Sequence, residues 1–248
     1  MSLLKIPTSK AGAMSFLVML VGTGYRHWTS GQVHHTKAEA FANRMHQLYG
    51  TEATTSERAT LKKHGKACAK LVMYPDDLDK TKIHFWLLAT LGKGAIHELE
   101  KLSDALYTPL TWGYQYHLKQ IQRNRGKGGG KTWTWQMQDT YFKNQFNAAK
   151  CAADLGQVGL KAHFTLIGRM PMFSGIRDQV QLLDEYARKT WNKQRNSKYP
   201  QALPVKLPSM PKIEVFKDLT LNKLVEEMLK AESERSQRAS EQAVEILG

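Results

Sequence analysis

Tyr25, Arg26 and His27 are three consecutive residues whose side chains can supply an acid, a cation and a base. Cleavage of RNA without a metal ion needs a general base for the ribose 2′-hydroxyl, a general acid for the leaving oxygen and a cation for the charged phosphorane. We therefore name these three residues as candidate catalytic residues, with Lys93 or Lys131 as an additional cation. The same residues also suit an ordinary polar loop, and the sequence leaves both interpretations open.

No motif around these residues identifies a family of enzymes. Crispr-type RNA-processing enzymes of ferredoxin-like fold cleave RNA by this metal-independent chemistry, so an endoribonuclease of that kind is our alternative function. The glycine-rich sequence near the C-terminus of those enzymes is absent here, so we favour a protein without catalytic activity. Residues 126–132 are similar to a phosphate-binding P-loop, but three residues instead of four follow the first glycine, and an alternating Trp-rich segment comes next.

The segment 110–137 combines aromatic and basic residues in a pattern that suits nucleic acid. Aromatic and polar residues alternate on both sides of a glycine-rich centre, which predicts a β-hairpin. Cations can neutralise phosphates while aromatic rings stack on bases. The candidate nucleic-acid-binding residues are Lys119, Arg123, Arg125, Lys127 and Lys131 of this hairpin, together with Lys93, Arg26 and Trp28.

The aromatic residues of this hairpin have a second interpretation, as one wall of a hydrophobic core. Trp112, Tyr114 and Tyr116 would then pack inward while the basic tip reaches outward. The two interpretations are compatible.

We expect neither a metal ion nor a cofactor. The nine histidines lack the spacing of a metal-binding motif. Cys68 and Cys151 make neither a disulfide framework nor a zinc site. Two isolated cysteines are typical of a reducing compartment.

The net charge of +14 is unevenly distributed along the chain. Residues 212–248 hold six Lys and Arg and eight Asp and Glu, so the preceding 211 residues carry a net +16. A basic body suits a polyanion such as nucleic acid. A membrane-surface protein would favour a basic amphipathic helix, which the sequence does not show. We expect a cytoplasmic or nucleoid-associated protein that does not bind a membrane.

The order of expected elements predicts an α+β fold with a mainly antiparallel sheet. We expect a buried strand over 14–21, a helix over 36–49 ended by Gly50, and a loop over 51–64. A hairpin over 66–74 and 82–91 follows, then a helix over 96–106. This is the order of a ferredoxin-like or RRM-like core, with the 110–137 hairpin added to the sheet.

Four regions are expected along the chain. Residues 1–137 form the sheet domain and 138–195 a helical region packed on it. Four prolines within twelve residues mark 196–212 as an extended linker. Residues 213–248 form a helical tail, either a docking arm for a partner or second copy, or a helix that folds back on its own body.

The favoured function is a basic nucleic-acid-binding protein, with single-stranded RNA or DNA as its ligand. We expect it to be a non-catalytic subunit of a ribonucleoprotein or replication-type assembly. Besides the endoribonuclease, a protein-interaction scaffold remains as a third alternative.

Overall fold

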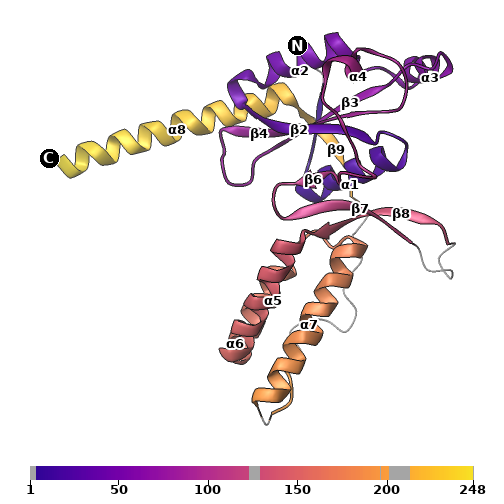
Figure 1. The fold of residues 1–248 in the computed structure, drawn as a ribbon. Helices are drawn as coiled ribbons and strands as arrows, with labels where there is room; N and C mark the ends of the chain where they lie inside the picture. The colour runs from indigo at the N-terminus through magenta and orange to yellow at the C-terminus, as the bar shows by residue number, and fades with distance from the viewer. Residues whose placement is uncertain (1–3, 123–128, 196, 201–212, 248) are drawn as a thin grey trace. The chain divides into compact units, whose positions relative to one another are not determined.

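The structure, a computed structural model, describes residues 4–122, 129–195, 197–200 and 213–247, and it has the expected α+β fold (Figure 1). The chain forms two compact units. Unit 1 consists of residues 1–107 and 214–248, and unit 2 of residues 108–213. Unit 2 therefore interrupts unit 1 in the sequence. This division differs from the expected sheet domain over 1–137, because the chain leaves unit 1 at Tyr107.

Unit 1 contains a four-stranded antiparallel sheet. Its strands, in the spatial order β3-β4-β2-β5, are β3 (Ala69–Pro75), β4 (Lys82–Ala89), β2 (His27–His34) and β5 (Ser103–Asp104). Helix α2 (His35–Tyr49) connects β2 towards β3, and β4 lies between these two strands. The expected ferredoxin-like core is not confirmed, because residues 14–21 are helical and the 110–137 strands lie in another sheet. The two elements that follow β4 in unit 1 are short. Helix α4 (Ala95–Leu99) has five residues and strand β5 has two.

Helix α1 (Lys10–Gly22) replaces the strand expected over 14–21, so that prediction was wrong. The helix begins where the Ser9 hydroxyl accepts a hydrogen bond from the Gly12 N–H at 3.1 Å. Such a cap satisfies one of the N–H groups that the first helical turn leaves without a partner. The run is apolar on all sides, so its periodicity could not separate a helix from a buried strand. None of the described helices is long and apolar enough to cross a membrane.

Two expected loops of unit 1 are regular elements. Residues 27–34 form the central strand β2, and helix α3 (Thr55–Lys63) lies within the expected loop 51–64. Helix α3 begins with a capping box, in which Thr54 and Glu57 satisfy each other's backbone N–H groups. The expected helix 36–49 is confirmed as α2, and Gly50 ends it in the left-handed conformation with φ 63°.

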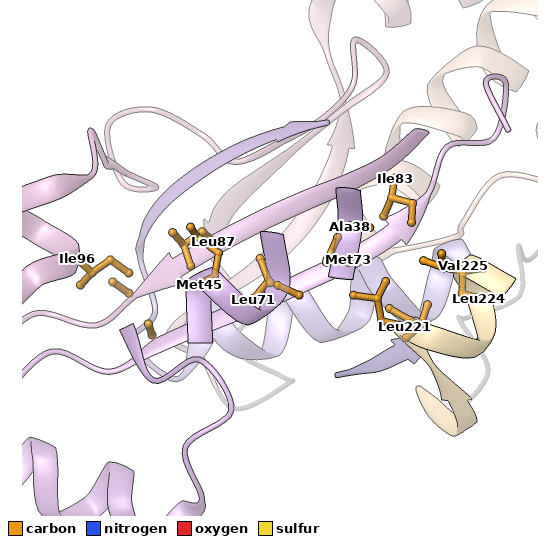
Figure 2. Packing of buried hydrophobic residues seen from close by; sticks show 14 residues of the cluster. Ala38, Met45, Leu71, Met73, Ile83, Leu87, Ile96, Leu221, Leu224 and Val225 are labelled. Carbon is orange, nitrogen blue, oxygen red and sulfur yellow. The ribbon is translucent and has the colours of Figure 1, made fainter. Parts of the chain in front are cut away.

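One apolar cluster holds unit 1 together, and it includes residues from both ends of the chain (Figure 2). Ile6 and Leu221 are fully buried in it with strand residues such as Leu87. Strand β1 (Lys5–Pro7) pairs with β9 (Phe216–Thr220), and α8 (Leu221–Leu247) follows at once. The first part of the tail therefore folds back on its own body. Most of the expected linker 196–212 lies outside the described residues.

The described residues of unit 2 form a separate three-stranded sheet and three helices. The sheet has the order β6-β7-β8, with β6 (Thr111–Trp112), β7 (Tyr116–Gln122) and β8 (Lys131–Met137). The helices are α5 (Asp139–Asp154), α6 (Gln157–Ile167) and α7 (Ser174–Gln194). The 110–137 segment thus forms its own sheet and does not extend that of unit 1. A turn at Gly113, with φ 52°, divides the expected first strand into two.

Helix α7 packs closely on the edge strand β8. A Cβ on Gly175 would lie 2.7 Å from the Trp135 carbonyl oxygen, so only glycine allows this approach. The Gln179 side chain accepts a hydrogen bond from the Met137 N–H at 2.6 Å and donates one to the Met137 carbonyl at 3.1 Å. The Gln179 amide thus forms hydrogen bonds with backbone groups that would otherwise have no partner at the edge of the sheet.

We predict that Leu221→Ala lowers the free energy of unfolding by about 2–5 kcal/mol, because it removes a fully buried side chain from the cluster. Leu229→Ala, on the same helix but 43% exposed, is the matched control and should cost less than about 1 kcal/mol. Chemical denaturation measures both. Equal losses would show that α8 is not part of the core.

Candidate functional site

The structure does not bring the three candidate catalytic side chains together. Tyr25 is buried, and its side chain lines a pocket with α1 and α3. Arg26 instead lies 3.6 Å from the Asp104 carboxylate in an ion pair. The His27 ring makes an edge contact with His97, at 5.0 Å between centroids. Arg26 and His27 thus remain near one carboxylate, that of Asp104, whereas Tyr25 lies in the pocket.

The surroundings of His27 favour its neutral form. Burial lowers the pKa of the imidazole, and the positive charge of Arg26 acts in the same direction, although Asp104 opposes it. The neighbouring His97 ring donates a hydrogen bond from its Nε2–H to the Thr90 carbonyl oxygen, 2.9 Å away. A neutral imidazole can act as a base and Arg26 lies close to it, but Tyr25 lines a pocket with α1 and α3 instead.

Two candidate nucleic-acid-binding residues of unit 1 differ in accessibility. Trp28 is buried, so its ring is not a surface for stacking bases. Lys93 is exposed in a tight turn, where its N–H donates to the Gly65 carbonyl at 2.9 Å. Gly92 has φ 139°, and a Cβ there would lie 2.5 Å from the Ala67 nitrogen. The turn thus holds the Lys93 backbone in one place.

The basic hairpin is described only in part. Lys119 and Lys131 are both exposed. The register pairs Lys119 with Thr134 and Gln122 with Lys131, so the two lysines lie on opposite faces of the sheet. The remaining three candidates, Arg123, Arg125 and Lys127, lie outside the described residues.

The core interpretation of the aromatic residues is confirmed for three of them. Trp112, Tyr116 and Trp135 are buried, with Trp112 and Trp135 in an edge contact at 6.4 Å. Tyr114, in the turn between β6 and β7, is instead 70% exposed. Most of the aromatic surface of the described hairpin residues is therefore used in packing, and Tyr114 and the partly exposed Trp133 are left for base stacking.

Unit 2 holds almost all of the net charge. It contains 17 Lys and Arg and 5 Asp and Glu, a net charge of +12, whereas unit 1 contains 19 and 17, a net charge of +2. In the described part of unit 2, nine exposed cations make neither an ion pair nor a side-chain hydrogen bond. They are Lys119, Lys131, Lys143, Lys150, Lys161, Arg169, Lys189, Lys193 and Lys198.

Seven of these nine cations were not among the candidates from the sequence. Charge counted along the chain did not reveal them, because the excess was assigned to residues 1–211 as a whole. Three arginines of unit 2 are used internally instead. Arg188 pairs with Asp184, while Arg177 and Arg195 donate to the carbonyls of Met172 and Asp154.

Among the described residues, no group of three or more His, Cys, Asp or Glu is placed to hold a metal ion. A carboxylate and an imidazole do meet in unit 1, where Asp76 Oδ2 lies 2.6 Å from His84 Nε2. Gln32 also donates to Asp76, at 2.9 Å. Cys68 is buried and Cys151 is exposed, and both are free thiols.

Comparison of the chain with protein-family models, with curated proteins and with solved structures gives no match.

We predict that Asp76 stabilises unit 1 at neutral pH and loses this effect in acid. Although burial alone would raise it, the N–H groups of Asp79 and Leu78 and the His84 imidazole hold the pKa of Asp76 below its ordinary value. A lowered pKa stabilises the fold above the ordinary aspartate pKa of about 3.9, and the effect is lost as pH falls through the lower folded value.

The measurement is the free energy of unfolding against pH for Asp76→Asn and wild type. The variant should be less stable at pH 7, and the difference should shrink below about pH 4. Glu227→Gln, at an exposed position of α8, is the control. A stability difference that stays constant down to the lowest pH would contradict the role of this carboxylate.

Proposed function

We propose that the protein binds nucleic acid through the cationic surface of unit 2 and does not catalyse a reaction on it. The observation that supports this most directly is the set of nine exposed cations with neither an ion pair nor a side-chain hydrogen bond in the described part of that unit. Proteins usually intersperse charges of both signs on their surface. A surface that lacks the acids to balance its lysines attracts polyanions and releases their counterions on binding.

The cations follow the helices of unit 2. Lys143 and Lys150 are seven residues apart on α5, and Lys189 and Lys193 are four residues apart on α7. These spacings bring each pair to one side of its helix. Helices α5 and α7 pack against each other within unit 2. Each helix thus presents a pair of lysines that can contact phosphates along a strand.

In this proposal, contacts between lysines and phosphates provide most of the binding, and stacking of aromatic rings on bases contributes little. The rings of Trp112, Tyr116 and Trp135 are buried, which removes the main argument for single-stranded ligands. Contacts to phosphates position a protein on nucleic acid but carry no sequence information. We therefore infer binding that depends strongly on salt and weakly on base sequence. We keep the proposal that the chain acts as a subunit of a nucleoprotein assembly.

The alternative of an endoribonuclease would need Tyr25, Arg26 and His27 around one phosphate. Arg26 and His27 both lie near Asp104, but Tyr25 instead lines a pocket with α1 and α3. The binding assay also tests this point, because an RNA ligand should be recovered intact.

The test is binding of a labelled oligonucleotide, single- or double-stranded, across a series of salt concentrations. One variant removes the four helix lysines together, by substitution to Gln at Lys143, Lys150, Lys189 and Lys193. A second removes the basic hairpin cations, by substitution to Ala at Arg123, Arg125, Lys127 and Lys131. The plot of log affinity against log salt should lose about 0.7–0.9 of slope for each phosphate contact removed.

A matched control removes four exposed lysines from unit 1, by substitution to Gln at Lys37, Lys63, Lys66 and Lys101. Its net charge falls as much as that of the helix variant, so only the position of the charges differs. The control should keep most of the salt slope. If the control loses as much slope as the unit 2 variants, or if wild type shows none, the proposal is refuted.

A further inference from the structure

A pocket of about 450 Å³ lies within unit 1, between α1, α3 and β3. Phe16, Met19 and Leu20 of α1 give it an apolar wall. A volume near this value is typical of sites for small ligands. All residues that line it are among those the structure describes.

Three cations face this pocket, and no carboxylate lines it. Arg58 and Lys62 come from α3, one helical turn apart, and Lys70 comes from β3. The Arg58 guanidinium is held in place by the Ala53 carbonyl and by Thr55 Oγ1, to which it donates at 3.2 Å. The Lys62 ammonium lies over the Tyr25 ring, 5.7 Å from its centroid.

This arrangement is unfavourable for the protein alone. Burial lowers the pKa of Lys70, and the positive charge of Arg58 lowers it further, while Glu52 opposes the shift. Placing a partly buried ammonium beside a second cation costs stability. Such local conflicts occur mainly at functional sites, where a ligand supplies what the protein lacks.

A doubly charged anion is the ligand that three cations without an acid fit best. Arg and Lys both bind phosphate, the arginine through its fixed fork and the lysines as compact charges. Burial raises the pKa of Tyr25, with Cys68 acting in the same direction, so its hydroxyl stays protonated and can donate to an oxygen. The apolar wall needs a ligand with a flat or apolar body as well as a charged end.

We propose that this pocket binds a phosphate monoester of nucleotide size. The phosphate lies among Arg58, Lys62 and Lys70, and the body of the ligand packs on Phe16, Met19 and Leu20. A free nucleoside monophosphate and the 5′-phosphorylated end of an RNA or DNA strand share this chemistry. The pocket belongs to unit 1 and uses none of the nine unit 2 cations, so it does not depend on the function proposed above.

Calorimetric titration of the full chain with adenosine monophosphate tests the proposal, with adenosine as the ligand that lacks the phosphate. Wild type should bind the monophosphate, and inorganic phosphate should compete. Lys62→Gln should weaken binding by about tenfold or more, because it removes a charge-assisted contact. Lys63→Gln removes the same charge from the next residue of α3, which is exposed and does not line the pocket, and should bind like wild type.

Lys70→Met provides a second test, which distinguishes a ligand-binding lysine from a purely structural one. It keeps most of the aliphatic stem and removes the ammonium. Binding should fall by about tenfold or more, while the denaturation midpoint of the free protein should stay the same or rise, because a costly charge is removed. A structural cation would instead lower the midpoint.

Two trinucleotides, one with a 5′-phosphate and one with a 5′-hydroxyl, distinguish the sources of the ligand. Preference for the phosphorylated trinucleotide, abolished in Lys62→Gln, identifies a strand end. Binding of the monophosphate without that preference identifies a free nucleotide. The proposal is overturned if wild type binds neither the monophosphate nor the phosphorylated end, or if Lys62→Gln and Lys63→Gln behave alike. If the unit 2 variants lose binding of the labelled oligonucleotide, the conclusion about the unit 1 pocket stays the same.

Discussion

The burial of one apolar cluster from both ends of the chain is the constraint on which unit 1 depends. Ile6 precedes the sheet by some twenty residues, and Leu221 follows it by more than a hundred, yet both are fully buried in the same cluster. The pairing of β1 with β9 fixes the two chain segments beside each other. Unit 2 lies between the two segments of unit 1 in the sequence. The net positive charge of unit 2 therefore lies in one continuous stretch, residues 108–213.

The sequence was informative about elements whose periodicity was clear. Helix α2 and the β3–β4 hairpin were predicted close to their observed bounds. Helix α1 was not, because an apolar run without a polar face fits a strand and a helix equally well. Helix α3 had a usable signal in Thr54 and Glu57, which are spaced as in a capping box. The division at Tyr107 had none, since it depends on contacts between distant segments.

The candidate sites were harder to predict than the fold. Tyr25 and Arg26, adjacent in the sequence, were assumed to act together, but Tyr25 lines a pocket with α1 and α3 while Arg26 pairs with Asp104. The pocket cations show the opposite case. Arg58 and Lys70 are twelve residues apart, in a helix and in a strand, and only the packing of α3 beside β3 makes them neighbours. The spacing of Arg58 and Lys70 in the sequence does not predict that they lie close together.

The position of Leu221 near the end of the chain also sets an order of events during synthesis. A ribosome releases all of unit 2, residues 108–213, before it releases the segment that completes the core of unit 1. Domains fold as their residues emerge, N-terminal parts first. Unit 2 is continuous in sequence and can finish folding while unit 1 still lacks β9 and the start of α8. The half-built unit 1 must therefore remain soluble, with its apolar surface open, for as long as a hundred residues take to translate.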